Sequence, residues 1–531
     1  MFKKYLCKPM VTGLMAIGAT GAVAAQAQTI KLVMSPPAVE TNRYWNTPGD
    51  FALGPSMQGL VGHDAVSGSY DNSGLADSWT HSEDFKEWTF KLKPEAQFHF
   101  GWGPVTAADV VHSLALHTGP DTTLNGISQL EGAVAEAIDD HTVTFTLPAP
   151  QVDFLFVHGG RGSLVVYSKA QFDAEGLEGY DAMPAGTANL QYVERNVGQG
   201  LNFEKVVDHW SGEDANIDRL ELIFVSEAAT TLAKLLAKEV DIVILPRELQ
   251  GEALDAGFEA IPSTNASNQT TMLFNGSFLL PGYEGLDETL PWLDIRIREA
   301  INRSIDRVTM IDVLYDGRAE ILPVFGMDPR HEGYVPELAE RFEAEYGYDM
   351  DKVKALMDDA DYPDSFSNPV IPILSSTLAG NPEFPAMAEL MQVFLDEAGF
   401  QTEIVEMDWA NLGALRTARE AKFFHPMRNL PVKPSAVGIR NYYSAAGAPR
   451  NNYEDEVIEG LMTKYMASID PAEREELAGG IFTRVFEQYA VAPLASISAE
   501  VIVNPETVGG WVFPGTTSVG ISHFGSIVPA E

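Results

Sequence analysis

The chain of 531 residues contains a single cysteine, Cys7, so no disulfide bond can form within it. Its folded state must therefore be stabilised by a packed hydrophobic core and not by covalent cross-links. Hydrophobic residues make up 45% of the chain, which is enough for a sizeable core. The length predicts about two to four domains.

The first 27 residues have the order of features found in a secretory signal peptide. Lys3, Lys4 and Lys8 precede an apolar, small-residue stretch at 10–25, which ends in Ala25-Gln26-Ala27. We expect cleavage after Ala27 and a protein located in the periplasm. Cys7 precedes the apolar stretch, so no lipid anchor is predicted. Its removal with the signal would also exclude thiol catalysis and zinc–thiolate sites.

Acidic residues outnumber basic ones, with 75 Asp+Glu against 35 Lys+Arg and a formal net charge of −40. Such a surface repels nucleic acid and anionic lipid, so we predict neither as a partner. It would also steer cationic ligands toward the protein. The alternative interpretation is a solubilising surface suited to a salty habitat.

Strand-like and helix-like segments alternate without an internal repeat or a long linker. Apolar and polar residues alternate at 88–92 and 143–147, which is typical of half-buried strands, and 241–245 is typical of a short buried strand. Helical periodicity is found at 385–398, at 470–489 and in a single segment from Asp294 to Gly317. This mixture predicts an α/β protein with several sheets.

Common catalytic and metal-binding motifs are missing from the sequence. It contains no G-x-S-x-G elbow, no H-E-x-x-H helix, no phosphate-binding P-loop and no EF-hand loop. The run HGGRGS at 158–163 is similar to the oxyanion-hole glycines of esterases, but without an elbow we interpret it as a turn. His112 and His117 fall on different faces of a predicted helix, which argues against a shared metal ion. We therefore predict no catalytic site, no metal site and no cofactor.

Several long blocks give the chain a family resemblance. LADSWT at 75–80, WTFKLKP at 88–94 and TAADVVHSL at 106–114 resemble the signature region of the peptide/nickel class of extracellular solute-binding proteins of ABC transporters, family 5. Further blocks follow in family order at 139–147, 239–242, 297–307, 348–360 and 474–494. The resemblance covers nearly the whole chain after the signal. Trp79, Trp88, Phe90 and Phe98 within it are expected to pack a hairpin core.

The resemblance implies a fold and a role. The fold would be an α/β, two-lobed periplasmic-binding-protein fold (type II, large three-domain variant) with the ligand buried between hinged lobes. By analogy, 29–50, 184–270 and 493–531 form lobe I, 51–183 its subdomain and 271–492 lobe II. The role would be to capture a small solute and deliver it to ABC permease subunits in the inner membrane. We expect a monomer and no enzymatic activity.

One family feature is altered. Peptide-binding members carry a W-x-x-D-x-x-D-P-like segment whose first aspartate pairs with the amino group of a peptide, but the corresponding stretch here, 423–431, reads FFHPMRNLP. Arg428 falls near the expected aspartate. A buried cation there would favour a carboxylate, phosphate or sugar acid. The alternative is that Arg428 faces water or pairs with one of the many acids. The look-alike Asp361-Tyr362-Pro363-Asp364 matches a family turn and is not assigned a ligand role.

Aromatic and polar residues suggest further ligand contacts. The candidates are Tyr44, Trp45, Trp409, Asn429, Arg440 and Tyr442, in addition to Arg428. Aromatic side chains beside arginine and asparagine suit sugars, heteroaromatics or amides, although the same residues also fill irregular loops. The resemblance favours a peptide or peptide-like solute, and Arg428 favours an anionic or sugar-bearing one such as an opine or oligosaccharide. Nickel or a metal chelate, a secreted hydrolase and a sensory role remain alternatives.

Overall fold

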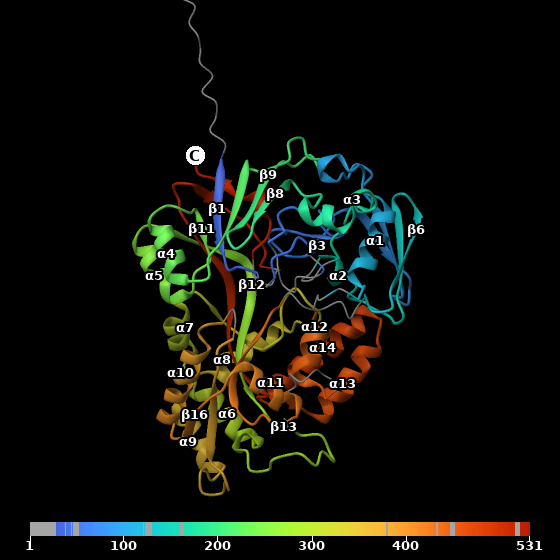
Figure 1. Cartoon of the computed structure of the whole chain (residues 1–531). Helices are drawn as coiled ribbons and strands as arrows, with labels where there is room; N and C mark the ends of the chain where they lie inside the picture. Colours follow the sequence, from blue (N-terminus) through green and yellow to red (C-terminus); the bar gives the residue numbers. More distant parts are fainter. Residues whose placement is uncertain are drawn as a thin grey trace, which may run out of the picture.

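Two long antiparallel strands, β12 (Glu259–Phe274) and β19 (Val491–Val503), run through the middle of the largest sheet (Figure 1). The computed structural model describes residues 28–37, 39–43, 45, 52–120, 122, 130–159, 164–378, 381–431, 434–445, 452–515 and 521–531. Within them this sheet has eleven strands in the order β16-β15-β17-β12-β19-β11-β1-β10-β9-β8, with β14 also paired to β19. The predicted signal peptide and Tyr44 lie outside the described residues.

One half of the sheet, which we call the first lobe, lies beyond the amino end of β12. It contains β1 (Thr29–Met34), β8 (Leu190–Asn196), β9 (Gly200–Lys205), β10 (Arg219–Phe224) and β11 (Ile242–Val243), with α4 (Ala228–Leu236) and α5 (Arg247–Asp255). The strand β1 is parallel to both β10 and β11. Ile30, Leu32 and Val33 are almost fully buried, as expected for a parallel strand covered on both faces.

The other half, the second lobe, lies beyond the carboxyl end of β12. Its strands are β14 (Glu320–Ile321), β15 (Val370–Ser375), β16 (Gln401–Glu406) and β17 (Phe424–Asn429). Its helices are α6 (Ile295–Ser304), α7 (Arg307–Tyr315), α8 (Pro336–Tyr346), α9 (Met350–Asp359), α10 (Phe384–Glu397), α11 (Trp409–Thr417), α12 (Ser435–Tyr443), α13 (Glu456–Ala467) and α14 (Pro471–Glu487). Two large hydrophobic cores result, one with α6, α7, α9 and α10 and the other with α8 and α12–α14, and a small third cluster includes α11.

The chain passes between the lobes along β12 and β19. Near its start β12 pairs with the end of β19, beside β11, and near its end it pairs with the start of β19 and with β17. The pairing of β12 with β19 shifts register between Pro262 and Ala266, between Ala266 and Asn268, and between Thr270 and Thr271. These irregularities bend the strand where the lobes meet. The predicted domain boundaries at 270/271 and 492/493 fall within these two strands.

A separate four-stranded antiparallel sheet forms the subdomain beside the first lobe (Figure 1). It consists of β4 (Ala76–His81), β5 (Glu87–Leu92), β6 (Val134–Asp139) and β7 (Thr142–Thr146). Residues of α1 (Ala107–His117) and α2 (Phe156–Gly159) share its core, and α3 (Lys169–Ala182) lies against α1. The short strands β2 (Gly62–His63) and β3 (Tyr70–Asp71) precede it. Trp88, Phe90 and Phe98 are buried in its core and Trp79 packs against it, which confirms the predicted hairpin core.

The structure corrects the predicted single helix from Asp294 to Gly317. It is broken at Ile305 into α6 and α7, because the Asp306 carboxylate accepts a hydrogen bond from the backbone N–H of Thr309 and starts a new helix. As a result Val308, predicted on the buried stripe, is 62% exposed. Within the described residues no helix is long and apolar enough to cross a membrane.

Candidate functional site

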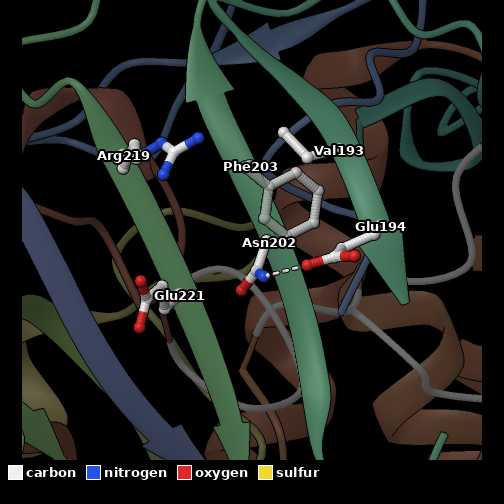
Figure 2. Close-up of a pocket in the computed structure, with 6 residues that line it drawn as sticks. All are labelled: Val193, Glu194, Asn202, Phe203, Arg219 and Glu221. Carbon is white, nitrogen blue, oxygen red and sulfur yellow. Dashed lines mark hydrogen bonds between the residues drawn. The ribbon is translucent and has the colours of Figure 1, made fainter. Parts of the chain in front are cut away.

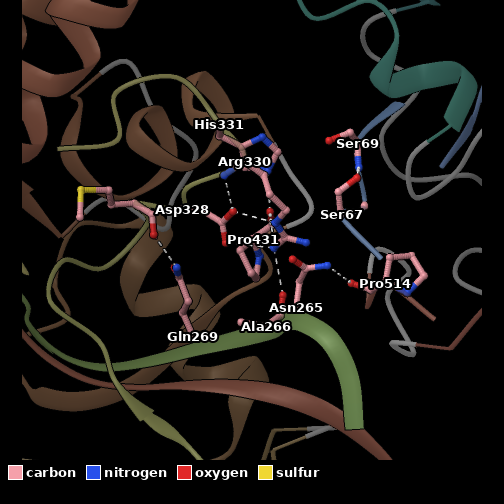
Figure 3. Close-up of polar contacts among 12 residues, drawn as sticks. Ser67, Ser69, Asn265, Ala266, Gln269, Asp328, Arg330, His331, Pro431 and Pro514 are labelled. Carbon is pink, nitrogen blue, oxygen red and sulfur yellow. Dashed lines mark hydrogen bonds and ion pairs between the residues drawn. The ribbon is translucent and has the colours of Figure 1, made fainter. Parts of the chain in front are cut away.

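A polar network surrounds β12 at the point where it passes between the lobes (Figure 3). Gln269 is its centre: its Nε2 donates to the carbonyl of Met327 (2.7 Å), and its Oε1 accepts from the N–H of Gly326 (3.0 Å) and from Nδ2 of Asn429 (3.1 Å). Gln269 and Asn429 are both buried. These bonds fix the loop at 326–332 and the end of β17 against the crossing strand.

Arg330 is the positively charged residue of this network. Its Nε and Nη2 donate to the Asp328 carboxylate at 2.7 and 2.9 Å, and Nη2 also donates to the carbonyl of Ala266 (3.0 Å) on β12. The Arg330 side chain is 11% exposed and that of Asp328 6% exposed. Nη1 of Arg330 is buried and has no hydrogen-bond partner among the residues that the structure describes. The fork is therefore rigid, and one donor nitrogen remains available.

The subdomain approaches the same point from the other side. Nδ2 of Asn265 donates to the carbonyls of Val66 (2.8 Å) and Pro514 (3.2 Å), and the hydroxyl of Thr264 donates to the carbonyl of Val66 (2.7 Å). The loop at 64–69 is thus bound to β12 directly before Ala266. Figure 3 shows Ser67 from this loop on the side opposite Arg330.

Charged residues of the subdomain and the second lobe also meet. Asp153, which precedes α2, lies close enough to Glu332 and Arg474 for their charges to act on it. Burial raises the pKa of Asp153, and the Glu332 carboxylate raises it further, whereas Arg474 acts in the opposite direction. Arg474 itself is paired with Glu332. Asp153 is therefore an acid whose charge the protein compensates only in part.

In the sequence, His331 stands between Arg330 of the polar network and Glu332 of the pair with Arg474. Its Nε2 is 2.6 Å from the carbonyl of Pro431. Burial lowers the pKa of His331, although Asp328 acts in the opposite direction. The neutral ring is therefore favoured, donating from Nε2 to Pro431. The described residues contain no group of three or more His, Cys, Asp or Glu that could hold a metal ion.

Three of the residues predicted from the sequence lie together at the end of β17. The backbone carbonyl of Arg428 accepts a hydrogen bond from the Tyr442 hydroxyl (2.8 Å), and Nη1 of Arg428 donates to Oδ1 of Asn381 (3.0 Å). Asn429 follows and joins the network around Gln269. The Arg428 side chain is half-buried, and Tyr442 is almost fully buried.

The other predicted residues are placed elsewhere. Trp45 is 3% exposed in the core of the first lobe, where its ring contacts Tyr167 at 5.0 Å between centroids. Trp409 is half-buried, with the Arg416 guanidinium 6.0 Å from its ring centroid. Arg440 is exposed on α12. The structure does not bring these three residues to the polar network.

Sequence reasoning missed the residues that form the network and its charged neighbours. They are Asp153, Asn265, Gln269, Asp328, Arg330 and Glu332. The one signal, and only for Asp328, Arg330 and Glu332, is the polar run DPRHE at 328–332, which separates two apolar stretches. A run of this kind also occurs in surface loops, so the sequence offered no reason to select it.

A small surface hollow of about 60 Å³ lies on the outer face of the first-lobe sheet (Figure 2). It is lined by residues of β8, β9 and β10, among them Glu194, Arg219 and Glu221, and Asn202 donates to Glu194 within it (2.9 Å). Pockets for small molecules typically measure about 300–1,000 Å³. This hollow is too small to hold such a solute.

Comparisons with known proteins agree on one family. Residues 72–446 match the family described as bacterial extracellular solute-binding proteins, family 5 Middle. The chain is 27% identical over 363 residues to heme-binding protein A of Haemophilus influenzae, covering 64% of this chain and 62% of that protein. It is 24% identical over 359 residues to the dipeptide-binding protein of Escherichia coli, covering 63% of each. The matches thus span less than two thirds of either relative.

A solved structure supports the same fold over a longer stretch. HbpA2 from Haemophilus parasuis superposes with a TM-score of 0.77 at 22% sequence identity, covering 95% of this chain and 100% of that one. The likeness confirms the predicted α/β, two-lobed fold.

Proposed function

Because the chain belongs to the bacterial extracellular solute-binding proteins of family 5, we propose that it captures a small solute between its lobes and delivers it to an ABC importer. The observation that carries this proposal is the polar network on β12, where both lobes and the subdomain meet around Arg330. The solute would be a peptide or a peptide-like molecule. Capture would take place in the periplasm, after removal of the signal peptide, and without chemical change to the solute.

The two-lobed arrangement suits reversible capture. The lobes are connected along β12 and β19, whose register shifts lie beside the network, so a small change there moves one lobe relative to the other. A solute enclosed at this point would lose its contact with water. Hydrogen bonds from Arg330 and Asn429 then become stronger, because the local dielectric constant is lower.

An anionic or sugar-bearing solute, such as an opine or an oligosaccharide, is the second candidate. Arg428 supports it, since this half-buried residue lies near the end of β17, close to the position at which the resemblance leads us to expect the aspartate of peptide-binding members. Its bond to Asn381 would have to open or be shared for the guanidinium to hold a solute. A carboxylate would form stronger, charge-assisted bonds with Arg428 than a neutral group would.

Thermal denaturation of the purified protein would test the proposed function. We expect a higher melting temperature with peptides of two to five residues, and no product when the solute is recovered. A ligand at 100 times its Kd adds about 2.7 kcal/mol, which is a shift of a few degrees. A shift only with sugar acids or other anions would favour the second candidate, and turnover of the solute would contradict the proposal.

Substitution of Arg428 separates the two candidates. If this residue holds an anion, Arg428→Ala abolishes binding of the anionic solute and leaves the melting temperature of the free protein nearly unchanged. Arg219→Ala, at an exposed position in the first lobe, is the control and should bind normally. Unchanged binding by Arg428→Ala would exclude it as the anchor.

A further inference from the structure

Among the described residues, two Asp-x-Arg pairs form forks of the same geometry. In both, the arginine donates from Nε and Nη2 to the aspartate two residues earlier: Arg296 to Asp294 and Arg330 to Asp328. In the first fork Nη1 of Arg296 continues to Asp359, to its backbone carbonyl (2.6 Å) and its carboxylate (3.1 Å). Every side of that guanidinium has an acceptor.

The second fork lacks the last of these contacts. Nη1 of Arg330 is buried and has no hydrogen-bond partner among the described residues, although the Arg330 side chain is 11% exposed against 39% for Arg296. The more deeply buried arginine is thus the one with an unused donor. A buried donor that lacks an acceptor destabilises the folded protein, so its retention needs an explanation.

Two other buried arginines of the second lobe use all three of their guanidinium nitrogens as donors. Arg307 donates from Nε to Pro493, from Nη1 to Asn302 and Tyr346, and from Nη2 to Asn302. Arg474 likewise uses all three nitrogens. The unused Nη1 of Arg330 therefore differs from the fully used guanidinium nitrogens of Arg307 and Arg474.

The direction of Nη1 indicates what it serves. Arg330 is fixed by Asp328 on one side and by the carbonyl of Ala266 on another. Figure 3 shows that the side of the guanidinium facing away from Asp328 is directed toward Ser67 and Asn265. That side is where the subdomain loop meets the second lobe.

We propose that Nη1 of Arg330 binds a carboxylate of the captured solute. This inference rests on the proposed function and adds a chemical class to it. The Asp328 carboxylate balances the charge of Arg330 while the site is empty, so no isolated cation is buried. A solute carboxylate then adds a charge-assisted hydrogen bond to a guanidinium that is already held in place, with little further loss of conformational entropy.

The test compares matched solutes on matched variants. The panel consists of peptides of two to five residues, dicarboxylic acids and sugar acids, each as the free acid and as its primary amide. Arg330→Lys retains a positive charge beside Asp328 but cannot present the fork and Nη1 together. Arg296→Lys makes the same change in the other fork and serves as the control. Melting temperatures of the free variants establish that both are folded.

We expect the unaltered protein and Arg296→Lys to bind the acid about tenfold more tightly than its amide. Arg330→Lys should lose this preference, mainly through weaker binding of the acid. Equal binding of acid and amide by the unaltered protein, or a preference that persists in Arg330→Lys, would overturn the inference and leave the proposed function intact. If no member of the panel binds the unaltered protein, the proposed function fails and the inference fails with it.

Discussion

Arg474 on α14 and Glu332 in the loop before α8 form a two-pronged ion pair across 142 residues of sequence, with Nε–Oε1 and Nη2–Oε2 distances of 2.8 and 2.9 Å. The Tyr465 hydroxyl donates to the same carboxylate at 2.5 Å. The Arg474 side chain is 7% exposed. Glu332→Gln would leave this arginine without its counter-charge, and we expect it to lower the free energy of unfolding by about 2–3 kcal/mol. Urea denaturation would measure the loss.

An exposed pair in the same lobe provides the control for Glu332→Gln. Lys354 and Asp358 lie 3.0 Å apart on α9, with side chains 76% and 68% exposed. Asp358→Asn should change the free energy of unfolding by less than about 0.5 kcal/mol. If both substitutions lower the free energy of unfolding by the same amount, the buried Arg474–Glu332 pair contributes no more to stability than an exposed pair does.

A second prediction concerns the face of the crossing strands covered by α5 and α7. The side chain of Glu500 on β19 is 6% exposed; it forms an ion pair with Arg247 (3.2 Å) on α5 and accepts a hydrogen bond from Arg318 (3.3 Å) after α7. Glu500→Gln would remove the negative charge that balances both arginines. We expect it to lower the free energy of unfolding, measured by urea denaturation, by about 2–4 kcal/mol. Glu506→Gln removes a charge of the same kind from a site 67% exposed, and little change is expected there. A stable Glu500→Gln protein would rule out this ionic link between the lobes.

A third prediction contrasts two glycines. A Cβ added at Gly186 would lie 1.8 Å from the backbone oxygen of Ser56, which also accepts from Thr187 and Ala188. Gly186→Ala should therefore lower the free energy of unfolding by more than about 2 kcal/mol and displace residue 186 from Ser56. A Cβ at Gly413, within α11, has no neighbour within 4 Å, so Gly413→Ala should stabilise the protein by up to about 1 kcal/mol. Thermal denaturation of both variants checks the opposite signs.

The fourth prediction is acid sensitivity of the subdomain. Burial lowers the pKa of His117 and of His158 to about 3 in the folded protein, against an ordinary value of 6.5. The unfolded chain then binds more protons below pH 6.5, so stability is complete above that pH. It is lost as the pH falls toward 3, by up to about 1.4 kcal/mol per pH unit for each histidine.

Substitution of one histidine would verify this origin of the acid sensitivity. The His158 ring lies among Phe90, Phe145 and Phe154, with centroids 4.7–5.1 Å away, so a leucine fits its apolar surroundings. His158→Leu should reduce the fall in melting temperature between pH 6.5 and 4, whereas His81→Gln at an exposed position should not. A pH profile that is the same in all three proteins would exclude His158 as a source.

The elements of the subdomain were predictable because local patterns decide them. Alternation at 88–92 and 143–147 corresponds to β5 (Glu87–Leu92) and β7 (Thr142–Thr146). The broken helix shows the limit of such patterns. Apolar spacing continues through Ile305 and Val308, yet the hydrogen bond from Thr309 to Asp306 decides the local structure, and side-chain capping of this kind competes with helical periodicity.

The candidate site was less predictable, because its residues meet only in the folded protein. Arg330 is two residues from Asp328 in sequence, but its contact with Ala266 spans 64 residues and that of Asn265 with Val66 spans 199. The periodicity of apolar residues carries no information about contacts between residues so far apart in the sequence. Trp45 illustrates the converse, since an aromatic residue in a predicted loop lies in the core of the first lobe. Resemblance to the family indicated the role and did not indicate these side chains.

The place of β19 in the large sheet has a consequence for how the chain acquires its structure. This strand separates β12 from β11, so the edges of both stay open until residues 491–503 arrive. A chain made from its amino end therefore carries unpaired strand edges for most of its synthesis, and pairing across such distances along the chain is slow. That delay keeps the polypeptide unfolded for longer. It also makes the polypeptide dependent on protection from aggregation until its last strands have emerged.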